Sequence, residues 1–145
     1  MKKYLAGVTS GDLNGIGLEI LSKAFFSDKS LFKDFCLIGN EKSILEYCEK
    51  SGIDKSFLNK SNVSSGIDII DCSDYSEIEF GKITSGSGKS SFEAVLKSIE
   101  LLKNQVIKGV VTLPICKESW YKADIKYRGH SEILCSNIIP EIFLI

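Results

Sequence analysis

The stretch ITSGSGKSSFEAV, residues 83–95, contains the residue types that bind phosphate groups in nucleotide-binding loops. Such a loop follows the pattern G-x-x-x-x-G-K-[ST], in which backbone amides surround the phosphates and a lysine neutralises them. Residues 88–90 supply the last three positions, but the first position is Ile83. A β-branched residue does not readily adopt the positive φ that a loop glycine supplies. The pattern therefore favours a flexible loop, capped by one of its serines, that leads into a helix. A helix N-terminus there could still bind an anionic substrate group without binding ATP.

Polar side chains also follow several apolar runs, at the places where strands are expected to end. In a parallel α/β sheet, ligands bind at the carboxyl ends of the strands, so polar residues there are candidates for a binding cleft. The candidates are Asp12, Asn14, Thr112, Lys117, His130 and Ser131. The G-x-G of residues 15–17 does not complete a dinucleotide fingerprint, because the next required position is Ile20. A structural interpretation stays open for each segment: a tight turn, a solvated lysine, or a histidine that serves only packing.

Apolar runs alternate with amphipathic segments along the chain. Strands are expected over residues 4–9, 34–39, 67–71 and 108–114, and helices over residues 18–26, 40–50, 92–106, 117–123 and from 131 onward. Asn14 and Asn40 are predicted helix N-caps, and Gly52 is a predicted helix stop. Val110 and Val111 are expected to be buried in the fourth strand. This order of elements predicts an α/β fold of three layers with a mostly parallel sheet.

The bulk composition limits the possible functions. With 145 residues, of which 43% are hydrophobic, the chain is long enough for one domain with a core of its own. Its formal net charge of -1 offers no basic face for nucleic acid, and no apolar run reaches the roughly 18 residues of a membrane span. Five cysteines, an odd number without a C-x-x-C pair, favour a reduced protein of the cytoplasm. The single histidine, His130, cannot form a metal site of several histidines within this chain.

Four short segments, taken in order, resemble the motifs of one enzyme family. GDLNGIGLE, GKITSGSG, TLPICKE and GHSE are similar to motifs of the 4-hydroxythreonine-4-phosphate dehydrogenases of vitamin B6 biosynthesis. The resemblance covers essentially the whole chain but only about the first half of a family member. It implies a fold similar to that of isocitrate and isopropylmalate dehydrogenases, here truncated. Residues 1–145 would be the N-terminal portion of a single dehydrogenase chain, with no separate second domain.

The same resemblance implies an oxidation of 4-phosphohydroxy-L-threonine by NAD or NADP. Hydride leaves the secondary alcohol carbon, and the resulting β-keto acid loses CO₂. A divalent metal, namely zinc, magnesium or cobalt, polarises the alcohol oxygen in that chemistry. Carried over by motif, His130 and Ser131 correspond to a histidine-threonine pair that binds the substrate. The residues implied to line the same cleft are Asp12, Asn14, Thr112 and Lys117.

Several departures from the family pattern limit what this chain is expected to do alone. The family usually has proline in place of Leu13 and Leu18, and asparagine in place of Cys116. Its metal-binding histidines and most of its cofactor site follow the GHSE motif, so we expect no metal ligand in this chain and no turnover by it alone. Members form homodimers, so a homodimer is expected. Residues 142–145 resemble the start of another buried strand, so the chain looks cut short and is expected to be poorly soluble by itself.

Two alternatives to this dehydrogenase remain open. A related dehydrogenase that acts on four-carbon sugar-acid phosphates would share these motifs, since its substrate also carries a phosphate on a short hydroxy acid. A non-catalytic remnant or binding module would keep the first half of the fold without its chemistry. In either case the partner is expected to be a small phosphorylated molecule, and neither nucleic acid nor a membrane.

Overall fold

Four parallel strands form a sheet at the centre of the protein. The computed structural model describes residues 1–59, 65–72 and 74–138. The strands in these ranges are β1 (Tyr4–Thr9), β2 (Phe35–Gly39), β3 (Asp68–Asp71) and β4 (Ile107–Thr112). They are ordered β3-β2-β1-β4, and each neighbouring pair is parallel. The predicted α/β fold with a parallel sheet is confirmed.

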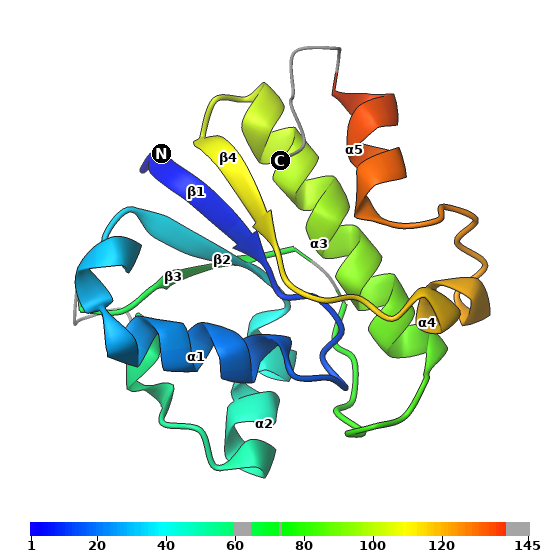
Figure 1. Cartoon of the computed structure of the whole chain (residues 1–145), viewed down its shortest axis with the longest axis horizontal. Helices are drawn as coiled ribbons and strands as arrows, with labels where there is room; N and C mark the ends of the chain where they lie inside the picture. The colour runs from blue at the N-terminus through cyan, green and yellow to red at the C-terminus, as the bar shows by residue number, and fades with distance from the viewer. Residues whose placement is uncertain (60–64, 73, 139–145) are drawn as a thin grey trace.

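Helices cover both faces of this sheet (Figure 1). One face carries α1 (Gly17–Ser27) and α2 (Glu41–Ser51), together with the short 3₁₀ helices η1 (Lys29–Phe32) and η2 (Lys55–Phe57). The other face carries α3 (Ser85–Lys103), against which α4 (Lys117–Lys122) and α5 (His130–Asn137) pack. The three predicted layers are therefore present. Within the described ranges, no helix is both long enough and apolar enough to cross a membrane.

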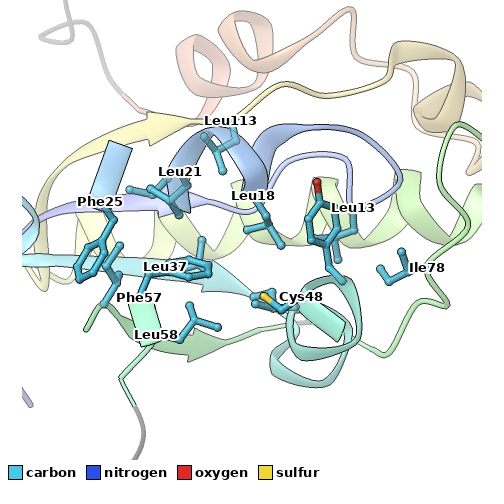
Figure 2. Packing of buried hydrophobic residues seen from close by; sticks show 14 residues of the cluster. Leu13, Leu18, Leu21, Phe25, Leu37, Cys48, Phe57, Leu58, Ile78 and Leu113 are labelled. Carbon is cyan, nitrogen blue, oxygen red and sulfur yellow. The ribbon is translucent and has the colours of Figure 1, made fainter. Parts of the chain in front are cut away.

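Alternate side chains of the central strands fill two separate cores. Leu37 of β2 belongs to the core between the sheet and α1, together with Leu18 and Phe25 (Figure 2). Cys36 and Ile38, which flank Leu37, belong to the core beneath α3. All three β2 side chains are 0% exposed. This pattern is expected of an inner strand in a parallel sheet, where successive side chains point to opposite faces and both faces are covered.

The long helix α3 begins earlier than the sequence predicts. Its N-cap is Thr84, whose Oγ1 accepts a hydrogen bond of 3.1 Å from the N–H of Ser87. The GSGKSS segment therefore lies in the first turns of the helix, and the expected flexible loop with a serine cap is wrong. A Cβ at Gly88 would overlap the carbonyl oxygen of Ser119 in α4. Gly88 is thus needed for the close approach of α3 and α4.

The buried face of α3 consists largely of small residues. Its buried positions are Ser87, Gly88, Ser90, Ser91, Ala94, Val95, Ser98, Ile99 and Leu101. Leu96, although an apolar residue at helical spacing, is 42% exposed. The helix also ends at Lys103, so Val106, which the predicted range included, lies beyond it. Val95 and Ile99 do lie on the buried face, and small residues, which give no apolar signal in the sequence, fill most of its other positions.

Of the three residues predicted to cap or end a helix, two are confirmed. Asn40 caps α2, with its Oδ1 accepting a hydrogen bond of 2.8 Å from a backbone N–H of the first turn. Gly52 ends the same helix with a φ of 71°, a left-handed conformation that glycine adopts without strain. The prediction for Asn14 is wrong, since the N-cap of α1 is Ile16. The strand expected at residues 142–145 lies outside the described residues.

Candidate functional site

The candidate site lies where the carboxyl ends of β1 and β4 meet. These strands are neighbours, but α1 after β1 covers one face of the sheet while α4 after β4 joins the other. Such a reversal is where ligands bind in open α/β sheets. The loops that follow the two strands contact each other, because the N–H of Asp12 donates a hydrogen bond of 2.8 Å to the carbonyl oxygen of Pro114. Gly11, with a φ of +66°, permits this approach, since a Cβ there would overlap the same oxygen.

The side chain of Asn14 joins the loop after β1 to the segment that precedes α3. It is only 3% exposed. Its Oδ1 accepts a hydrogen bond of 2.8 Å from the N–H of Glu79. Its Nδ2 donates to the carbonyl oxygen of Lys82 at 3.1 Å and to Oγ1 of Thr84 at 3.2 Å. Both N–H groups of the amide are therefore engaged inside the protein, and Asn14 holds residues 79–84 in place.

Hydrogen bonds between side chains and the backbone stabilise the same loop. The carboxylate of Asp12, which is half-buried, accepts a hydrogen bond of 3.0 Å from the N–H of Asn14 and so closes an Asx turn. The hydroxyl of Tyr47 donates to the carbonyl oxygen of Gly15 at 2.7 Å. A Cβ at Gly17 would lie 3.1 Å from Cβ of Leu113. The glycines of the G-x-G segment thus serve the turn and its packing, and they do not form a cradle for a dinucleotide.

Lys117 and the start of α5 form the other part of the candidate site. A Cβ at Gly129 would lie 3.6 Å from Cε of Lys117, so the lysine side chain runs beside the residue that precedes α5. Lys117 is exposed, and no carboxylate of the described residues lies within ion-pairing distance of it. Ser131, in the first turn of α5, is exposed as well. These two polar groups are open to a ligand.

His130 occupies a more protected position than its neighbours. Its ring meets Trp120 edge to face, with centroids 6.0 Å apart and an interplanar angle of 86°. Trp120 is fully buried, and its Nε1 donates a hydrogen bond of 2.8 Å to Oγ of Ser91. Burial lowers the pKa of His130 below its usual 6.5, so the imidazole is neutral at pH 7. Its Nε2 is shielded from solvent and has no hydrogen-bond partner among the described residues.

Thr9 of β1 lies at the candidate site, although the sequence did not predict it. It pairs in register with Thr112 of β4, at the carboxyl end of both strands. Thr9 is 0% exposed, and no described group is hydrogen-bonded to its Oγ1. Its only signal in the sequence is a hydroxyl at the end of an apolar run, which many buried strands share.

Lys122 was not predicted either. Its Nζ donates a hydrogen bond of 2.9 Å to the carbonyl oxygen of Ile83 and thereby connects α4 to the segment before α3. On β4, Val111 is 44% exposed, so its predicted burial is wrong.

The residues of this chain do not fit the metal and the cofactor that the resemblance implies. Within the described ranges, no three His, Cys, Asp or Glu side chains gather where they could hold a metal ion. The G-x-G turn is closed by packing against Leu113, so it leaves no place for a pyrophosphate. The site offers one neutral imidazole, one lysine and several hydroxyl groups. Such a set can bind a phosphate or carboxylate group, and it contains no hydride acceptor.

The fold and the site together define an α/β protein whose candidate ligand site lies at the reversal point of a parallel sheet. A profile described as pyridoxal phosphate biosynthetic protein PdxA matches residues 22–141, and the chain belongs to this family. The matched range includes the GKITSGSG, TLPICKE and GHSE segments on which the resemblance was based.

Three known proteins illustrate how far this likeness extends. The chain is 32% identical over 127 residues to the 4-hydroxythreonine-4-phosphate dehydrogenase of Campylobacter fetus, covering 88% of this chain and 38% of that protein. It is 33% identical over 142 residues to a Clostridium botulinum protein named for D-threonate 4-phosphate dehydrogenase activity, covering 91% and 42%. The crystal structure of 4-hydroxythreonine-4-phosphate dehydrogenase from Klebsiella pneumoniae has the same fold, with a TM-score of 0.79 at 22% identity over 92% of this chain and 44% of that one. The chain thus spans less than half the length of the relatives it matches.

Proposed function

We propose that these 145 residues form the substrate-binding portion of a dehydrogenase that oxidises 4-phosphohydroxy-L-threonine with NAD or NADP, with loss of CO₂. Family membership and the name of the Campylobacter fetus relative support the substrate class. The observation that carries the proposal is the start of α5: Nε2 of His130 is shielded without a partner among the described residues, and the side chain of Lys117 runs beside Gly129, the preceding residue.

Each residue of the site has a role in this proposal. His130 offers a neutral imidazole, which can hydrogen-bond a hydroxyl or phosphate oxygen without a second charge. Ser131 adds a hydroxyl in the first turn of α5, and Lys117 neutralises the negative charge of the substrate. Asp12 follows β1 and Thr112 ends β4, and in this proposal both residues line the substrate cleft. Asn14 acts indirectly, by holding the segment before α3.

The metal ion and the nicotinamide cofactor would be held by residues other than these. The proposal therefore includes no activity for the chain alone, and it assigns the hydride transfer to a complete assembly, which we expect to be a homodimer. No two of the five cysteines, all of which lie in the described ranges, form a disulfide, which fits a reducing compartment such as the cytoplasm.

A second candidate substrate is D-threonate 4-phosphate, which the Clostridium botulinum relative favours. Both candidate substrates are four-carbon acids with a phosphate at C4 and a secondary hydroxyl at C3. They differ at C2, where one carries an ammonium group and the other a hydroxyl.

A binding experiment tests the proposal on the chain itself. We would titrate it with 4-phosphohydroxy-L-threonine, D-threonate 4-phosphate and inorganic phosphate, and follow the fluorescence of Trp120, the single tryptophan. We expect one of the two substrates to bind more tightly than phosphate, and His130→Ala to weaken that binding. Equal affinity for all three ligands, or affinity that is unchanged in His130→Ala, would support a non-catalytic remnant. Reduction of NAD or NADP by the chain alone would also contradict the proposal.

A further inference from the structure

The orientation of the His130 imidazole depends on packing. Its Nε2 has no hydrogen-bond partner among the described residues. The second side-chain torsion of a histidine is broad, so a ring without a bond at this nitrogen depends on the atoms that surround it. Trp120 is such a neighbour, since the two rings meet edge to face with centroids 6.0 Å apart. A group that fixes the indole of Trp120 therefore also restricts the imidazole.

Ser91 of α3 fixes the indole of Trp120. Trp120 is 0% exposed, and its Nε1 donates a hydrogen bond of 2.8 Å to Oγ of Ser91. An indole nitrogen can only donate, so a buried tryptophan needs an acceptor at this position. The hydroxyl of Ser91 donates its own proton to the carbonyl oxygen of Gly88 at 3.0 Å, so its oxygen can accept the indole N–H. The position of the indole is thus fixed relative to the backbone of α3.

Other aromatic rings limit how far the indole can tilt. Phe92, next to Ser91 on α3, meets Trp120 edge to face, with centroids 5.5 Å apart and an interplanar angle of 84°. Phe92 also stacks on Tyr127, with centroids 5.9 Å apart. These rings belong to the core that α4 and α5 form with α3 (Figure 1). The packing limits the tilt of the indole, and the hydrogen bond to Ser91 sets its position within its own plane.

A second buried serine of α3 shows what is particular to Ser91. Ser98 lies two helical turns further along the same side of α3. The two side chains are 1% and 0% exposed, and each hydroxyl donates to the carbonyl oxygen of the residue three positions earlier. Of these two serines, only Ser91 bonds to Trp120, the single tryptophan of the chain. Alanine at either position removes the same local hydrogen bond, so the comparison isolates the contact with the indole.

We propose that Ser91 is a positioning residue for substrate binding, because it holds Trp120 and thereby keeps the His130 imidazole in one orientation. The inference rests on the proposed role of His130 in binding the substrate. Ser91 is 1% exposed, so it acts without contacting the ligand. A side chain that is already oriented loses less conformational freedom on binding, and this gain applies to ligands that bond to His130. Inorganic phosphate, which can approach the exposed Lys117 in many orientations, should gain little.

Nuclear magnetic resonance of the free chain tests the connection from Ser91 to His130. The single tryptophan and the single histidine each give one set of side-chain signals, so their assignment is unambiguous. Ser91→Ala should shift both the indole N–H signal of Trp120 and the ring signals of His130. Ser98→Ala is the control and should leave both unchanged. Unchanged His130 signals in Ser91→Ala, or equal shifts in the two serine variants, would overturn the proposal.

A second variant tests the same connection if Ser91→Ala folds poorly. Trp120→Phe removes the indole N–H and keeps an aromatic ring, so the ring signals of His130 should shift. In the Trp120→Phe background, Ser91→Ala and Ser98→Ala should affect His130 equally, because the contact that distinguishes the two serines is already lost. A further shift that only Ser91→Ala causes would show that Ser91 acts on His130 by another route, which contradicts the proposal.

Calorimetric titration connects the orientation of His130 to ligand affinity. Ser91→Ala should bind 4-phosphohydroxy-L-threonine about fivefold more weakly than the wild type and inorganic phosphate less than about twofold more weakly. Ser98→Ala should change either affinity by less than about twofold. An unchanged substrate affinity in Ser91→Ala, or an equal loss in both serine variants or for both ligands, would overturn the inference and leave the proposed function standing. No substrate binding by the wild type would instead contradict the proposed function, and with it the inference.

Discussion

The two parts of the candidate site differ in how their polar groups are used. Around Asn14, both amide N–H groups and the amide oxygen bond to residues 79–84, and the carboxylate of Asp12 closes a local turn. Around Lys117 and His130, the lysine has no carboxylate partner and the imidazole Nε2 has no partner among the described residues. A polar group that is already satisfied contributes to stability, whereas an unsatisfied protected group is costly unless a ligand bonds it.

We therefore treat the Asn14 region as a scaffold and the Lys117–Ser131 region as the proposed binding surface. The Asn14 region fixes the loop after β1 against the start of α3, whereas Lys117 and Ser131 are exposed. Mutations in the first region should therefore lower the free energy of unfolding, while mutations in the second should lower ligand affinity. The next four predictions test this separation, from the largest expected effect to the smallest.

Gly88→Ala should have the largest effect, because it disrupts the helix pair that supports the second region. The new Cβ would overlap the carbonyl oxygen of Ser119, so α3 and α4 must move apart. We expect a loss of about 3 kcal/mol in the free energy of unfolding, measured by urea denaturation. Gly109→Ala is the control, since its Cβ enters open space. Equal stability of the two variants would show that α3 and α4 do not need this contact.

Asn14→Ala should cost slightly less, and its effect should be local. The change removes three part-buried hydrogen bonds and leaves their partners without the amide, which costs about 2 kcal/mol. Hydrogen exchange of the amides of Glu79 and Gly81 should become much faster than that of the sheet. Asn104→Ala, at an exposed asparagine after α3, is the control and should change stability by less than about 0.5 kcal/mol. Unchanged exchange at residues 79–84 would contradict the scaffold role.

Lys117→Ala and Ser131→Ala should give the opposite pattern. Both side chains are exposed, so the free energy of unfolding should change by less than about 0.5 kcal/mol. Each variant should weaken the binding of 4-phosphohydroxy-L-threonine by about tenfold, because a hydrogen bond to a charged group is lost. Calorimetric titration measures the affinity. A variant that is destabilised but binds normally would place its residue in the scaffold.

The pH dependence of stability should report the burial of His130. Burial lowers its pKa in the folded state, so the unfolded chain takes up a proton first as the pH falls. The free energy of unfolding should therefore decrease as the pH falls through 6.5, and this contribution is fully present above that value. In His130→Gln this part of the pH dependence should disappear. Identical melting curves for the two proteins across this range would show that His130 is not desolvated.

The sequence predicts the scaffold of this protein better than its details. Alternating apolar runs and helix caps predict the succession of strands and helices along the chain and the ends of α2, because these features depend on local chemistry. The buried face of α3 was only partly predicted, because Ser91 and Ser98 are buried beside Val95 and serine gives no apolar signal at helical spacing. Asn14 resembled a helix cap, but its partners lie 65 to 70 residues away in the sequence. The pairing of Lys117 with Gly129 is likewise tertiary, so no local pattern predicts it.

Amide-resolved NMR during a titration with 4-phosphohydroxy-L-threonine tests the central claim most directly. The claim is that ligand binds to the Lys117–Ser131 region while the Asn14 region stays fixed. We predict saturable shifts of the amide signals of Lys117, Gly129, His130 and Ser131, with those of Glu79 and Gly81 unchanged. Shifts that are confined to residues 79–84, or no saturable shift at Lys117 and His130, would contradict it.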